Sequence, residues 1–178
     1  MIHAYSRKEK NVLLRPLEEK DIEQLRVWRN NPSNTKYLRK IPIITKEKQR
    51  SWFVSYLNNP DELIFAIEEC EDLNRLVGSL SLYSFNGSSC CFGRILVGDN
   101  EAHNKNVGLN ATIAVIKVAF YQLGLEKIEL TVFPENLPAL TIYNKAGFNI
   151  ENEHITEEGR IEYLMVIKKE DISTDNNE

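Results

Sequence analysis

The chain has 178 residues, of which 42% are hydrophobic and 27% are charged, and its formal net charge is −4. Such a composition is typical of one soluble globular domain, and its mixed, slightly acidic charge argues against a general nucleic-acid-binding protein. The three cysteines lack metal-ligand spacing, and no apolar run is long enough to span a bilayer. We therefore expect a cytoplasmic protein that needs no metal and has neither a nucleic-acid nor a membrane partner.

The first half of the chain is expected to form one strand, two helices and then antiparallel strands. Residues 1–10 are polar and predict a loose start, and the strand at 12–17 ends near its proline. Apolar spacing predicts helices over 18–30 and from Thr45 to residue 57, the second with Thr45 as its N-cap. The strands that follow are expected at 63–68, 76–83 and 91–97, with a hairpin turn at 86–89.

The second half of the chain alternates helices with strands. A helix is expected to run to Leu123, with Gly124 after it, and a strand to occupy 128–133. A short helix capped by Asn136 ends at Gly147, and a last hairpin and a polar tail are expected at 148–153, 162–168 and 169–178. The pattern predicts one α/β domain over 1–178, with a core of about 11–168 and a mixed, mostly antiparallel sheet.

The turn from His103 to Leu109 leads directly into a predicted amphipathic helix. The expected core-facing stripe of this helix is Leu109, Ile113, Ile116, Phe120 and Leu123. The first turn of a helix leaves N–H groups unpaired and carries partial positive charge, and Gly108 allows the backbone to approach a ligand. The turn therefore suits a phosphate or pyrophosphate. Taken alone, these residues fit an ordinary buried helix start better than an anion site.

The helix that begins at Asn136 places three useful side chains on one face. Asn136, Ala139 and Tyr143 are three and four residues apart, which aligns them along the helix. That face offers an amide, room for a ligand and a phenol. A lone tyrosine is more often a half-buried core residue, so only the phosphate-type turn upstream favours a functional role for Tyr143.

Together the two stretches resemble the GNAT N-acetyltransferase superfamily. Its acyl-CoA pattern, R/Q-x-x-G-x-G/A at a helix start, is followed downstream by N-x-x-A-x-x-x-Y-x-x-x-G-F, which this chain matches at every fixed position from Asn136 to Phe148. In the first pattern His103 and Asn106 replace the usual Arg or Gln and the first Gly, and Gly108 is retained. Because Asn tolerates positive φ, we expect Asn106 to keep the turn, and a histidine can still donate to a phosphate.

The resemblance covers about residues 11–168. Leu14-Arg15-Pro16 and Trp28-Arg29-Asn30 are most similar to the branch that contains ribosomal-protein acetyltransferases and acetyltransferases of nucleotide-linked amino sugars. It implies a GNAT-like single domain with helices on both faces of the sheet. It also implies that acetyl-CoA lies between the strand ending at Val97 and the strand 128–133, which splay apart.

The resemblance also assigns roles on the cofactor side. Backbone around Leu96 and Val97 would bind the pantetheine arm, and Asn136 would steady the thioester. The residues of the turn that would hold the pyrophosphate are His103, Asn104, Lys105, Asn106, Val107, Gly108 and Leu109. Tyr143 would be the general acid, since a tyrosine, with a pKa of about 10, can supply the proton of a departing thiolate whose pKa is about 8.5.

The acceptor side rests on the helix end at Trp28, Arg29 and Asn30, which borders the acceptor pocket in the resembling branch. An arginine there can hold a carboxylate or a phosphate. An equally weighted alternative is structural: Trp28 continues an apolar stripe, Arg29 suits a helix C-terminus and Asn30 ends the helix. No general base is assigned, and Glu68, one candidate, fits a solvated strand residue better.

Three functions remain open at this point. The first is acetyl transfer from acetyl-CoA to the primary amine of a small molecule, by direct attack in a ternary complex, in a monomer or homodimer. A nucleotide-linked amino sugar is the leading acceptor. The second is N-terminal acetylation of a protein, which a groove between the first helices and the last hairpin would favour. The third is a non-catalytic acyl-CoA-binding or interaction module, suggested by His103 and Asn106.

Overall fold

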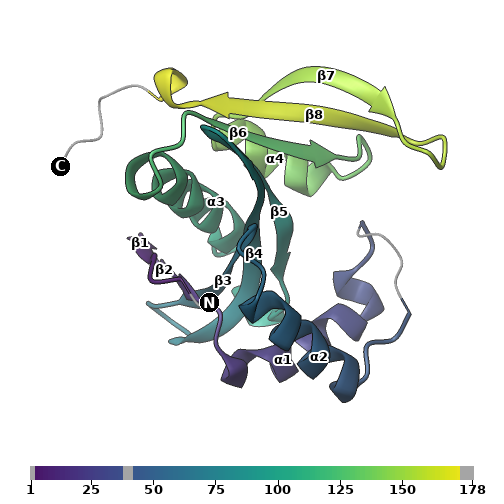
Figure 1. Ribbon diagram of the computed structural model, residues 1–178. Coiled ribbons are helices and arrows are strands. Elements are labelled where there is room, and N and C mark those ends of the chain that lie inside the picture. The colour runs from purple at the N-terminus through teal and green to yellow at the C-terminus, as the bar shows by residue number, and fades with distance from the viewer. Residues whose placement is uncertain (1–2, 38–41, 173–178) are drawn as a thin grey trace.

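An eight-stranded sheet forms the frame of the molecule, in the order β1-β2-β3-β4-β5-β6-β8-β7 (Figure 1). The computed structural model describes residues 3–37 and 42–172. Its strands are β1 (Arg7–Glu9), β2 (Val12–Pro16), β3 (Glu62–Glu69), β4 (Arg75–Asn86), β5 (Ser89–Val97), β6 (Lys127–Val132), β7 (Asn149–Ile155) and β8 (Ile161–Lys168). Its α-helices are α1 (Ile22–Asn30), α2 (Lys46–Leu57), α3 (Val107–Lys117) and α4 (Leu137–Lys145).

The helices divide between the two faces of the sheet, as Figure 1 shows for α3 and for the α1–α2 pair. On one face α3 and α4 pack over a core that includes Phe65 and Phe92. On the other face α1 and α2 cover a smaller cluster that includes Phe53 and Ile64. Side chains alternate along β3, so neighbouring residues serve opposite cores. All paired strands are antiparallel except β5 and β6, which confirms the predicted mixed sheet with helices on both faces.

Strands β5 and β6 run parallel but pair only near their beginnings. The last paired position joins Cys91 and Glu129, although both strands continue, β5 as far as Val97. Beyond this point β5 contains a bulge, where Arg94 has a φ of 54° and the register with β4 shifts. The two strands therefore part where the sequence resemblance places the acyl-CoA.

Most of the expected elements are present. The Thr45 side chain caps α2 by accepting a hydrogen bond from the Lys48 N–H at 3.3 Å. The expectation of a loose start over 1–10 was wrong for Arg7–Glu9, which pairs with β2 through a turn in which Lys10 has a φ of 50°. In the expected tail, Lys169–Asp171 form a short 3-10 turn. Residues 1–2 and 173–178 lie outside the described part of the chain.

Helix α3 is buried on more sides than a single apolar stripe predicts. Ala111 and Ala114 are fully buried, whereas Leu109 and Ile113 of the expected stripe are only half-buried. The helix lies against β1, β2, β5 and α4, and small side chains allow these elements to approach it closely. The helical segment ends before Gly124, as predicted, and this glycine has a φ of 70°.

Candidate active site

The N-terminus of α3 follows a turn that leaves the end of β5. Asn106 is the N-cap and has a φ of 57°, and Asn104 has a φ of 63°. The expectation that Asn106 adopts the left-handed turn is confirmed. Left-handed residues in a turn direct successive N–H groups toward one side, and the first turn of α3 contains no acidic residue. The turn thus combines unpaired N–H groups with the positive end of a helix dipole, which is the chemistry of an anion site.

Polar side chains brace this turn against neighbouring elements. The Asn11 amide donates to the Lys105 carbonyl at 3.1 Å and accepts from the Asn110 amide at 2.7 Å. The Lys105 ammonium forms an ion pair with Asp72. The exposed His103 ring has its Nε2 atom 3.3 Å from the carbonyl oxygen of Val97, at the end of β5. These contacts with neighbouring elements stabilise the conformation of the turn.

Gly108 lies where α3 packs closely against α4. A Cβ atom at this position would lie 3.0 Å from Cδ1 of Ile142. Its neighbour Val107 is buried and Leu109 is half-buried. Any contribution of these three residues to an anion site therefore comes from their backbone N–H groups, which belong to the first turn of the helix.

The other residues predicted on the cofactor side lie at the end of β5 and at the start of α4. Leu96 is buried in the cluster beneath α1 and α2, and Val97 is half-buried. Asn136 caps α4 as predicted, because its Oδ1 atom accepts a hydrogen bond from the Ala139 N–H at 3.3 Å. The side-chain oxygen of Asn136 thus already accepts a hydrogen bond at the start of the helix.

Tyr143 is a core side chain with a strongly perturbed phenol. It is 6% exposed, and its ring meets Phe92 and Phe148 edge to face, with centroids 5.9 and 6.0 Å away. Burial raises the pKa of Tyr143 well above its ordinary value, and the nearby Tyr83 raises it further. The hydroxyl therefore stays protonated at neutral pH and is available as a hydrogen-bond donor.

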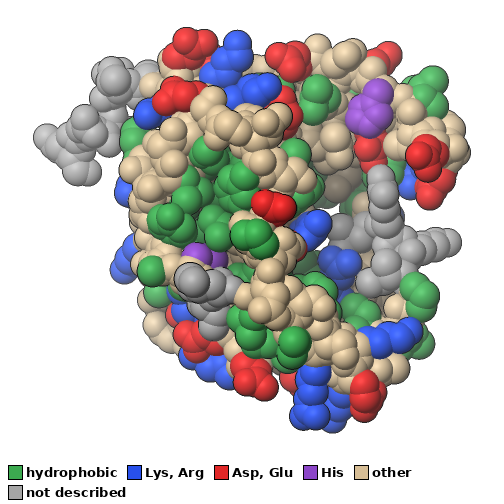
Figure 2. All heavy atoms as spheres, viewed as in Figure 1, with side chains coloured by type: hydrophobic (Ala, Val, Ile, Leu, Met, Phe, Trp, Pro, Cys, Tyr) green, Lys and Arg blue, Asp and Glu red, His purple; other side chains and the backbone are tan. Residues whose placement is uncertain are grey.

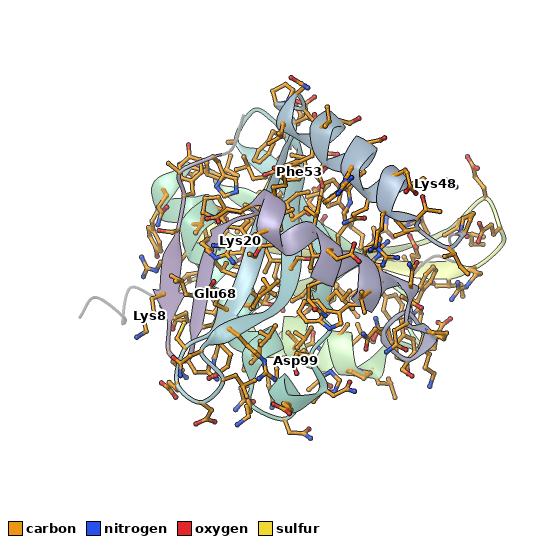
Figure 3. The ribbon with its side chains drawn as sticks, turned by 90° about the horizontal axis from the view of Figure 1, so that it is seen from below. Lys8, Lys20, Lys48, Phe53, Glu68 and Asp99 are labelled. Atoms are coloured by element: carbon orange, nitrogen blue, oxygen red, sulfur yellow. The ribbon has the colours of Figure 1, made fainter. Side chains whose placement is uncertain are left out.

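A cavity of about 540 Å³ lies between the α1–α2 pair and the sheet, on the face seen in Figure 3, where Lys48 and Phe53 mark α2. Figure 2 shows a hollow below the β7–β8 hairpin with Lys and Arg side chains in it. The residues that line the cavity are Leu25, Arg29, Pro42, Ile44, Lys48, Gln49, Trp52, Glu62, Ile64, Ser79, Ser81 and Arg94. Because the bulge of β5 contributes Arg94, the cavity lies beside the point where β5 and β6 part.

Of the three residues predicted to border the acceptor, the structure brings Arg29 into this cavity. Trp28 is 8% exposed and packs against Gly98, where an added Cβ would lie 2.2 Å from the indole. The Asn30 amide exchanges hydrogen bonds of 2.8 and 2.9 Å with the backbone of Ile44. The structural alternative therefore accounts for the contacts of Trp28 and Asn30, whereas Arg29 lines the cavity.

The cavity also contains residues that the sequence pattern did not single out. Glu62, at the start of β3, is 9% exposed and forms an ion pair with Arg94. The Arg94 guanidinium lies 4.4 Å from the centroid of the Tyr83 ring, and Tyr83 is opposite Glu62 in the β3–β4 register. Tyr83 in turn acts on the pKa of Tyr143. Tyr83 thus interacts with Arg94 at the cavity and influences the pKa of the buried Tyr143 phenol.

Glu68, the candidate base of the sequence analysis, lies outside this cavity. The Arg15 guanidinium donates to Glu68 at 2.7 Å and to the two carboxylate oxygens of Asp21 at 2.7 and 2.9 Å. In Figure 3 Glu68 lies near Lys20 and far along the face from Lys48. Glu68 therefore stabilises the junction of β2, β3 and α1 and is not among the described residues that line the cavity.

Comparison with known proteins decides the family. Residues 11–149 match the model of the Acetyltransferase (GNAT) domain. The chain belongs to the GNAT acetyltransferases. "Probable N-acetyltransferase YjcK" of Bacillus subtilis strain 168 is 32% identical over 152 residues, which cover 81% of this chain and 83% of YjcK. "Uncharacterized protein MJ1062" of Methanocaldococcus jannaschii is 28% identical over 82% of this chain, which spans only 31% of the length of MJ1062.

Two solved structures share the fold of this GNAT chain. The spermidine N-acetyltransferase from Vibrio cholerae in complex with CoA and spermine has a TM-score of 0.80 at 23% identity, and the match covers 91% of this chain and 98% of that one. Apo FdhC, described as a nucleotide-linked sugar GNAT, has a TM-score of 0.78 at 22% identity, with 95% and 93% covered. The predicted GNAT-like fold is confirmed. Over residues 3–37 and 42–172, no helix combines the length and apolarity needed to cross a membrane.

Proposed function

We propose that this GNAT acetyltransferase moves an acetyl group from acetyl-CoA directly to the primary amine of a small molecule. The observation that carries the proposal is the point where β5 leaves β6 after Cys91. The N-terminus of α3 and Tyr143 lie on one side of this point, and the cavity lined by Arg94 lies on the other. Such an arrangement supports a ternary complex, in which much of the acceleration comes from holding both reactants in register.

The residues on the donor side fit an acyl-CoA. The left-handed Asn104 and Asn106 and the first turn of α3 offer N–H groups to a pyrophosphate. The edge of β5 at Leu96 and Val97, beyond its pairing with β6, offers hydrogen-bonding groups to an amide-containing chain such as pantetheine. When bound, acetyl-CoA supplies the activated acetyl group. The left-handed turn at Asn106 keeps the geometry of the anion site despite this departure from the family pattern, so it supports acyl-CoA binding. Acetyl transfer itself distinguishes an enzyme from a non-catalytic acyl-CoA-binding module.

Two side chains fit the proton transfers. A lysine-like amine has a pKa of about 10.4 and must lose a proton before it attacks. We assign the removal of this proton to Glu62, which is the one carboxylate among the described residues that line the cavity. As the N–C bond forms and the C–S bond breaks, Tyr143 donates its proton to the departing sulfur. The nitrogen then loses a second proton to become an amide, and this proton returns to the oxygen of Tyr143, so that the reaction balances.

The cavity supports a small acceptor. Its volume of about 540 Å³ lies within the range of small-molecule sites, and α1, α2 and the sheet border it. A nucleotide-linked amino sugar is our leading acceptor, and the description of FdhC is in line with it. The N-terminus of a protein, the second candidate, would require a longer groove toward the β7–β8 hairpin, and no lining residue of the cavity comes from the described residues of that hairpin.

The test is calorimetric binding of acetyl-CoA to the parent, to Asn106→Asp and to the control Asn152→Asp in exposed β7. Aspartate tolerates the left-handed turn and suits a helix N-cap, so Asn106→Asp keeps the fold while adding a negative charge beside the pyrophosphate. We expect micromolar binding by the parent and the control, and binding at least about tenfold weaker by Asn106→Asp. No binding by the parent at millimolar acetyl-CoA would contradict the proposal.

A further inference from the structure

The charges that line the acceptor cavity are mostly positive. Arg29, Lys48 and Arg94 are cationic, and Glu62 is the one carboxylate among the described lining residues. The chain as a whole has a net charge of −4, so the positive cavity is a local feature and does not follow from composition.

Arg29 differs in its surroundings from Arg15, another half-buried arginine. It is half-buried in the last turn of α1, and burial, followed by the charge of Arg94, lowers its pKa. Across residues 3–37 and 42–172, no oxygen accepts a hydrogen bond from its guanidinium. By contrast, Arg15 is held by Asp21 and Glu68. A partly buried guanidinium that lacks a counter-ion in the protein is stabilised by an anion that a ligand brings.

We infer that the acceptor is an amine that also carries an anionic group, a phosphate or a carboxylate, and that Arg29 binds this group. The inference rests on the proposed acetyl transfer at the same site and narrows its substrate class. A guanidinium presents two parallel N–H groups to either anion. Lys48 and Arg94 border the same cavity and add to the attraction. Trp52, which is 38% exposed at the cavity, offers an aromatic surface to a ring of the acceptor.

Glu62, the one carboxylate among the described lining residues, completes the recognition. Arg94 is paired with Glu62, and an anion that enters beside Arg29 competes for Arg94. Glu62 then turns to the amine, which it must face to take a proton. A polyamine brings no anion, and its additional ammonium groups would enter beside three cations, where like charges repel. The cavity thus favours an acceptor with charges of both signs over spermidine, although a spermidine N-acetyltransferase shares this fold.

The experiment measures ligand binding by calorimetry while the protein is saturated with CoA, so that phosphates cannot bind at the α3 turn. Glucosamine 6-phosphate and UDP carry phosphate, glutamate carries carboxylates, glucosamine has no anion and spermidine has only cations. The variants are Arg29→Gln and a matched control, Arg50→Gln, at an exposed position of α2 outside the cavity. We expect at least one anionic probe to bind the parent and Arg50→Gln equally, and to bind Arg29→Gln about tenfold or more weakly. The probe that binds identifies the anion.

Spermidine is expected not to bind. The inference is overturned if spermidine or glucosamine binds more tightly than every anionic probe, if no anionic probe binds although CoA does, or if Arg29→Gln leaves the affinities unchanged. Arg29→Lys is the second variant, used if Arg29→Gln does not fold. It keeps the positive charge but loses the two parallel N–H groups of the guanidinium, so we expect an affinity between those of the parent and Arg29→Gln. A parent that does not bind CoA contradicts the proposed function, and the same titrations without CoA then still decide whether Arg29 binds an anion.

Discussion

The left-handed backbone at Asn106 offers a quantitative test of the turn before α3. Its φ is 57°, a conformation that is unfavourable by about 1–2 kcal/mol for an ordinary L residue. We therefore expect Asn106→Val to lower the free energy of unfolding by about 1–2 kcal/mol. For a chain of 178 residues this corresponds to a fall in Tm of about 2–8 °C. Asn106→Gly relieves the strain but adds freedom to the unfolded chain, so its change should stay within about 1 kcal/mol.

The same substitutions should affect ligand binding, because the turn at Asn106 directs the N–H groups of the proposed pyrophosphate site. Urea unfolding and calorimetry with acetyl-CoA on the same preparations measure both effects. Asn144→Val is the matched control, at an exposed position of α4, since Asn and Val have similar helix propensities. We expect Asn106→Val alone to lose affinity. If Asn106→Val unfolds and binds acetyl-CoA as the parent does, the reasoning from the left-handed turn is refuted.

Two further predictions concern buried groups. Gly98→Ala should lower the free energy of unfolding by about 1–3 kcal/mol, because its Cβ would lie 2.2 Å from the Trp28 indole; an unchanged urea transition would show that this contact does not constrain the fold. Burial raises the pKa of Cys90 to about 12, so between about pH 8.5 and 12 the folded chain keeps a proton that the unfolded chain releases. The stability linked to this thiol is complete below that window and is lost as the pH rises through it. From about pH 9 to 11 the unfolding free energy, measured by urea unfolding at each pH, should fall less steeply in Cys90→Ala than in the parent. Equal dependence of this free energy on pH in the two proteins would contradict the raised pKa.

The parts of the fold that depend on neighbouring residues in the chain could be predicted from the sequence. The Thr45 and Asn136 caps and the glycine turn after α3 follow from residues within one helical turn of each other, so local chemistry determines them. The buried face of α3 was harder, because the helix lies between the sheet and α4, and Leu109 is left only half-buried. Burial on several sides removes the periodicity on which the prediction depends.

The acceptor cavity depends on contacts between distant strands, which no local pattern encodes. Glu62 meets Arg94 from another strand, and Arg94 reaches it because a bulge in β5 changes the register with β4. Glu62 directly precedes the strand that the sequence predicts, and a glutamate at the end of a strand gives no sign of function in the sequence. Arg29 could be proposed from its family resemblance, but its lack of a carboxylate partner in the described chain is visible only in three dimensions.

The measurement that tests the central claim most directly is acetyl transfer itself, followed with labelled acetyl-CoA in single-turnover reactions against a panel of anionic amines. The account predicts that the parent forms a labelled amide. Tyr143→Phe, which loses only the hydroxyl, should bind acetyl-CoA with unchanged affinity and transfer acetyl about 100-fold more slowly or worse. Tyr121→Phe, at a position that is 59% exposed, should match the parent. A parent that binds acetyl-CoA yet acetylates no amine, or a Tyr143→Phe variant as fast as the parent, would contradict the account.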